Sequence, residues 1–153
     1  MSHAGKVFAV AVLVALTEAV VPVAEAQPRI RIGVTYARTG SLRAPGQHMM
    51  RGSRLCIKHA NDRGGVVGRR LELLVEDDGS DGPTAAALYE RLITRDEADA
   101  ILGLHSSPLT EAAADVIERH RMPMVANAAA TSIFKQGRKL VFVGGPPAER
   151  EIP

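Results

Sequence analysis

Cysteine and aromatic residues are scarce in this sequence, and its net charge is small. A single cysteine, Cys56, excludes an internal disulfide and a metal site built from several cysteines. Aromatic residues make up 3% of the chain and tryptophan is missing, so the core must be built from alanine, valine, leucine and isoleucine. The formal charge of +2 is too small and too evenly spread for a nucleic-acid-binding protein. What remains is an ordinary composition for one globular domain, 46% hydrophobic and 24% charged over 153 residues.

The first 26 residues have the pattern of a secretory signal peptide. Lys6 gives a weakly positive start, an unbroken apolar run follows at Val7–Leu16, and Ala24-Glu25-Ala26 has the small-x-small pattern that signal peptidase accepts. We expect cleavage after Ala26 and export, with no membrane insertion of the cleaved chain. The alternative is a membrane anchor, but polar residues and Pro22 interrupt the run well short of ~20 apolar residues. No cysteine follows the run, which excludes lipid attachment there.

Strand-like and helix-like segments alternate through residues 27–153. Apolar and β-branched runs predict strands at Arg29–Tyr36, Arg70–Glu76, Ala100–Leu104, Met122–Ala126 and Lys139–Val143. Helical periodicity predicts helices at Gln47–Asn61, at Thr84–Arg95, after Ser107, and as a short segment at Ser132–Gln136. Each crossover is long enough for a parallel connection, which requires a dozen or more residues. The sequence therefore predicts an α/β fold, a doubly wound and mostly parallel sheet with right-handed crossovers.

Two glycines have specific expected roles in and after the first helix. Gly52 would allow this helix to approach the sheet closely, on the side of the face that Met49, Ser53, Cys56 and Ala60 share. Gly64 follows the helix at the position where a left-handed cap is common.

The segment Ala100–Ser132 brings two loops to the carboxyl edge of neighbouring strands, where open α/β sheets bind ligands. Ser107 precedes Pro108, and proline is favoured at the first helical position, so Ser107 is the expected N-cap. The second loop, Asn127–Ser132, consists of small residues. The helix between them has one apolar face, formed by Leu109, Ala112, Ala113, Val116, Ile117 and His120.

Catalysis and metal binding have little support in the sequence. His105 stands beside Ser106, but adjacent side chains of a strand point to opposite faces, and no G-x-S-x-G elbow occurs. Asp77 and Asp78 lack a third ligand, and Cys56-x-x-His59 offers only two. The run Gly64–Gly68 lies between helix and strand, whereas a dinucleotide fingerprint lies between strand and helix. We therefore expect no enzymatic activity, no metal and no cofactor.

The two loops suit an α-amino acid. The start of the helix after Ser107 offers free N–H groups and a positive dipole end to a carboxylate, and the Ser107 hydroxyl can add a donor. The carbonyls of the loop Asn127–Ser132 and the Thr131 hydroxyl suit an ammonium group. The alternatives are that Ser107 only caps its helix and that Thr131 only caps the short segment after it. Tyr36 either packs or forms a wall of the site.

Four segments resemble the Leu/Ile/Val-binding family, the periplasmic amino-acid-binding proteins of branched-chain ABC transporters. They are IRIGVTYARTGSL, NDRGGVVGRRLELLVEDDGSD, TAAALYERLITRDEADAILGLHSSPLTEAAADV and RMPMVANAAATSIFKQGRKLVFVGGPP, which follow the family's order and cover nearly all of the chain after the leader. The resemblance implies the type I periplasmic-binding-protein fold. It also implies a two-lobed clamp that holds an amino acid and delivers it to a membrane permease.

The resemblance assigns ligand contacts to specific positions. Ser107 matches the serine that binds the ligand carboxylate, and Ala128 matches a residue whose main chain meets the ligand. The family's threonine falls on Ala130, with Thr131 next to it, so a one-residue shift and a lost contact are both open. Ser106, beside Ser107 in the same site, stands where the family can have the second cysteine of a disulfide. The family's aromatic wall falls near Pro45, which is not aromatic.

Members of this family are well over twice as long as this chain. We therefore expect residues 27–153 to form an N-terminal lobe, incomplete and truncated near the crossing to the second lobe. Because a clamp holds its ligand between both lobes, this chain alone should bind amino acids with a Kd worse than ~1 mM. The alternatives are the sensing lobe of an extracellular receptor and a small flavodoxin-like enzyme that uses Asp77 and Asp78.

Overall fold

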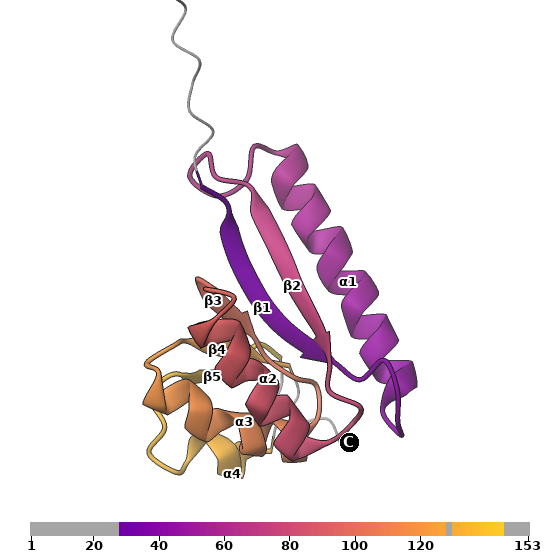
Figure 1. Ribbon diagram of the computed structural model, residues 1–153, viewed down its shortest axis with the longest axis vertical. Coiled ribbons are helices and arrows are strands. Elements are labelled where there is room, and N and C mark those ends of the chain that lie inside the picture. The colour runs from indigo at the N-terminus through magenta and orange to yellow at the C-terminus, as the bar shows by residue number, and fades with distance from the viewer. Residues whose placement is uncertain (1–27, 128–129, 146–153) are drawn as a thin grey trace, which may run out of the picture.

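The computed structural model describes residues 28–127 and 130–145. Its strands are β1 (Ile30–Tyr36), β2 (Leu71–Asp77), β3 (Ala100–Leu102), β4 (Met124–Ala126) and β5 (Val141–Val143). Its helices are α1 (Arg43–Asp62), α2 (Gly82–Thr94), α3 (Ser107–Arg119) and α4 (Thr131–Phe134). All pairings between the strands are parallel, and the order in the sheet is β2-β1-β3-β4-β5 (Figure 1). The predicted doubly wound α/β fold is confirmed.

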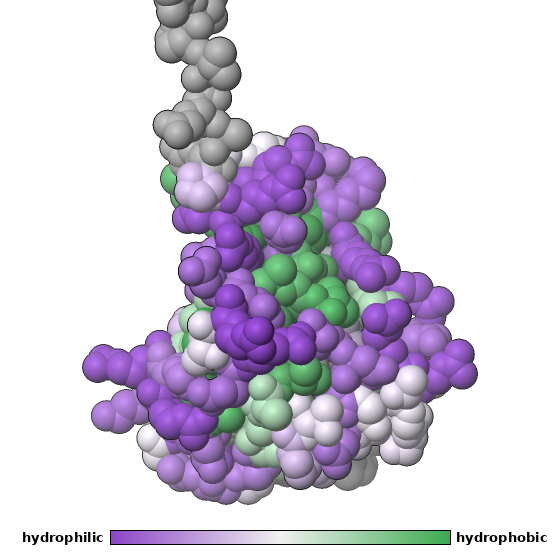
Figure 2. All heavy atoms as spheres, viewed as in Figure 1, coloured by the Kyte–Doolittle hydropathy of each residue, from purple (hydrophilic) through white to green (hydrophobic). Residues whose placement is uncertain are grey.

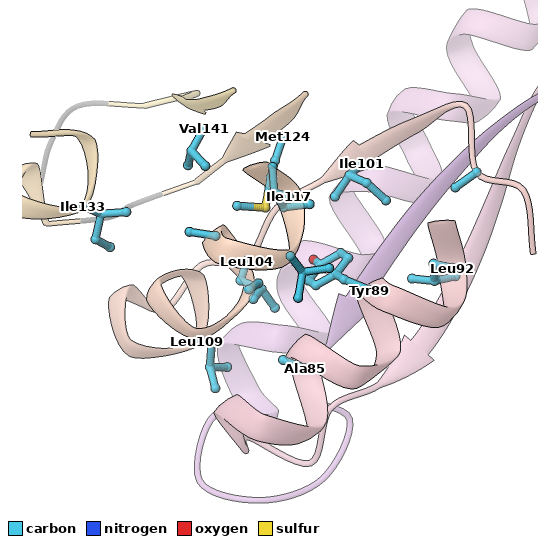
Figure 3. Packing of buried hydrophobic residues seen from close by; sticks show 14 residues of the cluster. Ala85, Tyr89, Leu92, Ile101, Leu104, Leu109, Ile117, Met124, Ile133 and Val141 are labelled. Atoms are coloured by element: carbon cyan, nitrogen blue, oxygen red, sulfur yellow. The ribbon is translucent and has the colours of Figure 1, made fainter. Parts of the chain in front are cut away.

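The strand order reverses at β1, and this places the helices on two faces. The chain moves from β1 to β2 in one direction and from β2 to β3, β4 and β5 in the other. With right-handed crossovers, α1 covers β1 and β2 on one face, while α2 and α3 pack together on the opposite face (Figure 1). The main core lies between α2, α3 and the strands β3 to β5 (Figure 3). Its largest fully buried apolar side chains are those of Tyr89, Leu92, Ile117, Met124 and Ile133.

The two edges of the sheet are less well covered than its centre. All seven residues of β2 are half-buried, and a hydrophobic area framed by hydrophilic side chains lies in the middle of the face seen in Figure 2. At the other edge, Val125 and Phe142 are paired in register and are 46% and 49% exposed. Among the helices of residues 28–127 and 130–145, none combines the length and the apolar composition that a membrane span requires.

Helix α1 begins four residues before the predicted Gln47. Pro45 lies in its first turn, where a missing N–H leaves no intrahelical bond unmade. Gly46, now inside the helix, is buried against the chain after β1: a Cβ there would lie 2.3 Å from the carbonyl oxygen of Ala37. Gly52 is exposed with no atom within 4 Å of its Cβ position, so the prediction that Gly52 permits close packing is wrong.

The end of α1 follows the predicted pattern more closely. Gly64 has a φ of +96° and donates its N–H to the carbonyl of Asn61, and the Gly65 N–H reaches the carbonyl of Ala60 at 2.9 Å. These two bonds form a Schellman motif, so the predicted left-handed cap is confirmed. Cys56, expected on the face that Met49, Ser53 and Ala60 share, is exposed.

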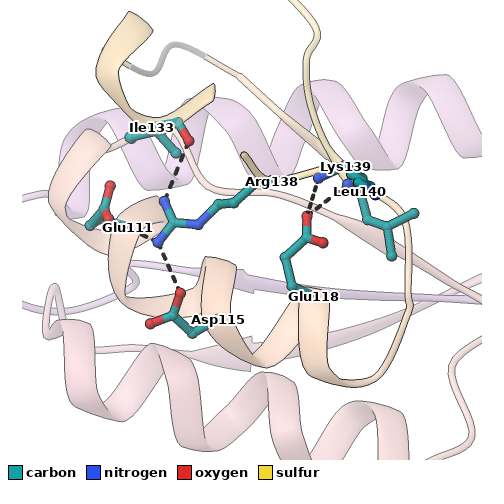
Figure 4. A network of polar contacts seen from close by, with 7 residues as sticks. All are labelled: Glu111, Asp115, Glu118, Ile133, Arg138, Lys139 and Leu140. Atoms are coloured by element: carbon teal, nitrogen blue, oxygen red, sulfur yellow. Dashed lines mark hydrogen bonds and ion pairs between the residues drawn. The ribbon is translucent and has the colours of Figure 1, made fainter. Parts of the chain in front are cut away.

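Polar contacts attach the chain before β5 to the outer side of α3 (Figure 4). The Arg138 side chain is only 9% exposed, and its guanidinium donates to Glu111 and Asp115 at 2.9 Å each. It also donates to the carbonyl of Ile133 at the end of α4. One oxygen of Glu118 accepts the backbone N–H groups of the two residues after Arg138, both at 2.7 Å. This network fixes the short strand β5 although few apolar residues hold it.

Candidate functional site

A small cavity of about 20 Å³ lies at the carboxyl ends of β1 and β3, where the strand order reverses. Open α/β sheets bind their ligands outside this reversal, because the loops after the two strands leave toward opposite faces and open a crevice between them. Three parts of the chain form most of the wall: residues 35–37, residues 104–106, and one side of α1 with Leu42, Gly46 and Met49. Asp78 and Leu109 complete it.

Three residues that line this cavity each have a buried polar atom without a hydrogen-bond partner in the described part of the chain: Thr35 Oγ1, Asp78 Oδ2 and His105 Nε2. Thr35 and Asp78 are fully buried residues. The Thr35 hydroxyl lies close enough to favour the charged form of Asp78, yet it makes no hydrogen bond of good geometry. A cavity of this size holds one water molecule, and three unsatisfied polar atoms would bind it well.

The two aspartates that end β2 have opposite environments. Partial burial would raise the pKa of Asp77, but hydrogen bonds from the backbone N–H groups of Gly79, Arg38 and Thr39 and from the Thr39 hydroxyl outweigh it and lower this pKa. Burial raises the pKa of Asp78, because only the N–H of Ser80 and the Thr35 hydroxyl oppose it. Asp77 therefore organises the loop after β1 as an anion. At the wall of the crevice, burial disfavours the charged form of Asp78.

We predict that Asp78→Asn stabilises the chain increasingly as the pH rises above the ordinary carboxyl pKa of 3.8. A carboxyl whose pKa is raised by folding binds its proton more tightly in the folded state, so the stability it contributes at low pH is lost as the pH rises through the folded-state value. The asparagine amide remains neutral and keeps an acceptor for Ser80. Urea unfolding at a series of pH values should show a difference on the order of 1 kcal/mol at neutral pH.

Asp81→Asn is the matched control for Asp78→Asn. Asp81 caps α2 by accepting from the backbone N–H and hydroxyl of Thr84, and these bonds lower its pKa. Its charged form is therefore the one that folding favours, and the asparagine variant should lose stability relative to the wild type as the pH rises. If the stability difference from the wild type changed with pH in the same way for both variants, the opposite environments of Asp78 and Asp81 would be contradicted.

The loop after β3, which contains Ser106, and the loop after β4 lie side by side, as the sequence predicted. The Ser107 hydroxyl oxygen accepts the backbone N–H of Ala130 at 2.9 Å, and strands β3 and β4 are paired. The N-cap of α3 is Ser106, not the predicted Ser107, which is the first helical residue. The shift of one residue directs the Ser107 side chain across to the neighbouring loop. Ser106 lines the cavity, and its side chain makes no capping hydrogen bond.

Of the other residues expected near the ligand, Thr131 and Tyr36 lie within the described part of the chain. Thr131 is the first residue of α4, one residue before the predicted start, with Ala130 as the N-cap. Ala128 lies outside the described residues. The Tyr36 side chain is 3% exposed and donates to the hydroxyl of Ser53, so Tyr36 packs against α1.

Sequence reasoning missed the buried polar wall of the crevice. The sequence treats Asp77 and Asp78 alike, as two acids that lack a third ligand, whereas the structure buries Asp78 and leaves Asp77 half-buried. His105 was considered only as a catalytic partner for the serines beside it. Within the described residues, no group of three or more histidine, cysteine, aspartate or glutamate side chains is placed to hold a metal ion.

The fold and the crevice together define a class of protein, the doubly wound α/β lobes that bind small ligands at a switch point. A comparison with protein families assigns the class more closely, because the family described as "Periplasmic binding protein" matches residues 29–150. The chain belongs to this family of substrate-binding proteins.

Curated relatives are similar over most of this chain. A leucine-, isoleucine-, valine-, threonine- and alanine-binding protein of Pseudomonas aeruginosa is 30% identical over 74% of the chain and 30% of the relative. Leu/Ile/Val-binding protein homolog 8 of Brucella abortus is 31% identical over 78% of the chain and 30% of the relative. The chain therefore spans about a third of the length of the curated relatives it matches. These similarities favour a transport-associated binding protein over a receptor lobe or a flavodoxin-like enzyme.

Solved structures of solute-binding proteins contain a lobe with the same fold. The branched-chain amino acid transporter substrate-binding protein LivJ from Streptococcus pneumoniae, in complex with isoleucine, superposes with a TM-score of 0.74 at 27% identity. That match covers 78% of this chain and 34% of LivJ. The leucine-binding protein LivK from Thermotoga maritima gives a TM-score of 0.65 at 29% identity, over 74% of this chain and 33% of LivK.

Proposed function

We propose that this chain is the first lobe of an exported solute-binding protein that takes up an amino acid, of branched-chain type, for an ABC transporter. The observation that carries the proposal is the hydrogen bond between Ser107 and Ala130, because it unites the two predicted contact loops at one edge of the sheet. The names of the relatives, which include leucine- and isoleucine-binding proteins, support the choice of ligand. The function is binding and delivery to a permease, not catalysis.

The geometry gives Ser107 a defined role toward a carboxylate. Its oxygen accepts the Ala130 N–H, and a hydroxyl that accepts a hydrogen bond still keeps its own hydrogen for donation. The first turn of α3 has no acidic residue, so its N–H groups and dipole favour an anion beside Ser107. Ala130 and Thr131 would face the ammonium group from the neighbouring loop, and Ser106 would border the same site. Ala128, outside the described residues, stays an expected main-chain contact of the ligand.

We predict that Ser107→Ala weakens isoleucine binding by about ten-fold, the loss of one hydrogen bond to a charged group. The measurement is an NMR titration of the chain with isoleucine, which should shift the amides of residue 130 and of the start of α3 with a Kd worse than ~1 mM, because the chain spans about a third of its relatives.

Ser53→Ala is the matched control for Ser107→Ala, because Ser53 does not line the crevice and its hydroxyl only accepts a hydrogen bond from the Tyr36 side chain. Its Kd for isoleucine should equal that of the wild type. A carboxylic acid of the same shape without the ammonium group should bind more weakly. Micromolar affinity of the chain would contradict the need for a second lobe, and undiminished binding by the Ser107 variant would contradict the assigned contact.

We further propose that residues 1–26 direct export and are removed after Ala26, and that the rest is a partial N-terminal lobe. The weakly positive start, the apolar run at Val7–Leu16 and the small residues before position 27 support this proposal. The segment lies outside the described residues. N-terminal sequencing of the exported chain, beginning at Gln27, would test it.

A further inference from the structure

A second and much larger hollow, of about 790 Å³, lies beside the first half of α1. It is bounded by the loop after β1, by the end of β2 and by one side of α1, which Figure 1 shows next to the carboxyl ends of these two strands. Its wall consists of Arg38, Thr39, Gly40, Arg43, Gln47, Met50, Arg51 and Asp77. None of these residues lines the crevice at the strand reversal.

Helix α1 lies between the two hollows, and a different side of the helix lines each of them. Leu42, Gly46 and Met49 recur at helical spacing and face the crevice. Each is followed by a residue that faces the larger hollow: Arg43, Gln47 and Met50, with Arg51 one turn beyond Gln47. A ligand in the larger hollow would therefore contact neither Ser107 nor the loop after β4.

The charges around this hollow are unbalanced. It has three arginines, and Asp77 is its single acidic residue. Two other hollows on the described surface have at least as many acids as arginines: one combines Arg29, Arg31 and Arg69 with Glu72, Glu97 and Asp99. Another combines two arginines with Glu72, Glu76 and Asp96. The larger hollow beside α1 thus has an excess of positive charge.

The single acid does not neutralise the arginines. Both oxygens of Asp77 accept hydrogen bonds from the loops beside it, namely from the N–H groups of Arg38, Thr39 and Gly79 and from the Thr39 hydroxyl. The guanidinium groups of Arg38, Arg43 and Arg51 form no ion pair with an acid in the described part of the chain. The first turn of α1 contains no acidic residue and has no side-chain cap. Three guanidinium groups around one concave surface repel each other unless an anion lies between them.

We propose that this hollow is a second binding site, for an oxyanion of the phosphate type with more than one negative charge. Arginine presents a planar set of donors that matches two oxygens of a phosphate, and several arginines can share such a group. The same chemistry is offered by a free phosphate compound in solution and by the headgroup of an anionic phospholipid. The hollow is open to solvent at the surface, so either source has access to it.

The first experiment titrates the chain with inorganic phosphate and with pyrophosphate at low ionic strength, followed by NMR. Amide shifts should concentrate in residues 38–40 and in the first half of α1, with pyrophosphate binding more tightly than phosphate. The variant Arg43→Gln/Arg51→Gln should weaken binding at least ten-fold, since it removes two charge-assisted contacts. Binding should also weaken as salt is added.

The matched control is Arg54→Gln/Arg63→Gln, which removes the same charge from the same helix and its C-terminal cap, outside the hollow. Its affinity for pyrophosphate should stay within two-fold of the wild-type value. An equal loss in both double variants would overturn the proposal, because it would show attraction to the overall charge. All four arginines are exposed, so both variants should keep the thermal stability of the wild type. Ser107→Ala should leave pyrophosphate binding unchanged, which separates this site from the proposed amino-acid site.

The second experiment distinguishes the two sources of phosphate. Sedimentation with phosphatidylglycerol vesicles, with phosphatidylcholine vesicles as the reference, measures binding to a headgroup. Vesicle binding that the Arg43→Gln/Arg51→Gln variant loses and pyrophosphate competes away assigns the site to a lipid headgroup. Pyrophosphate binding without vesicle binding assigns it to a free phosphate compound. Absence of binding to both probes would overturn the proposal.

Discussion

Replacing Gly46 by alanine is expected to destabilise the chain by about 3 kcal/mol, although alanine is the better helix former. The new Cβ would lie 2.3 Å from the carbonyl oxygen of Ala37, and 3.0 and 3.1 Å from two other backbone atoms of that residue. Because the contact is with backbone, no side-chain rotation can relieve it, and α1 must move away from β1. Urea unfolding followed by circular dichroism measures the loss.

Gly52→Ala is the control for Gly46→Ala, about one and two-thirds turns further along the same helix. Gly52 is exposed with open space around its Cβ position, so alanine should raise the free energy of unfolding by up to ~1 kcal/mol through helix propensity. Opposite signs for the two substitutions are therefore expected. A mild effect at both positions would show that α1 does not depend on close approach at Gly46.

The movement forced at Gly46 should also reach the ligand crevice. Gly46 and Ala37 both line the cavity at the strand reversal, on opposite sides of the contact. A shift of α1 would separate the helix from the end of β1 and widen the cavity that Thr35, Asp78 and His105 share. The close packing of this helix thus links the stability of the lobe to the shape of its candidate site.

The order of strands and helices could be predicted because each element has a simple pattern. Apolar runs covered on both faces mark β1 and β3, and helical periodicity marks α2 with its buried Tyr89 and Leu92. The start of α1 could not be predicted in the same way, because Pro45 and Gly46 suggest a loop by composition. Tertiary packing against Ala37 decides their conformation, and a pattern within one helix does not contain that contact.

The candidate site was predictable in its outline and not in its details. Parallel strands that are neighbours in the sheet bring their following loops together, which places Ser107 beside Ala130. The identity of the N-cap differed by one residue because serines occupy both adjacent positions. The buried polar wall depends on which of the two aspartates, Asp77 or Asp78, faces inward. The larger hollow beside α1 depends on which side of α1 faces β2. Both follow from packing between elements far apart in the sequence.

Replacing Tyr89 by phenylalanine is expected to cost about 2 kcal/mol, although the aromatic ring fills the same space. The pairing of β1 with β3 ends at Val34 and Leu102, and beyond this point the two strands separate. The Tyr89 hydroxyl lies between them, donating to the carbonyl of Leu102 at 2.9 Å and facing the N–H of Thr35 at 3.4 Å. Burial raises the pKa of Tyr89 above the ordinary value of tyrosine, so the hydroxyl keeps its proton at neutral pH.

Removal of this hydroxyl leaves a donor on β1 and an acceptor on β3 without their partner, which costs more than the loss of one exposed hydrogen bond. Tyr36→Phe is the control, since its hydroxyl donates to the half-buried side chain of Ser53 and joins no two strands. Urea unfolding should rank the variants with Tyr89→Phe clearly less stable than Tyr36→Phe. Amide hydrogen exchange at Thr35 should accelerate in the Tyr89 variant alone. Unchanged exchange there would mean that the ends of β1 and β3 hold the crevice open without help from α2.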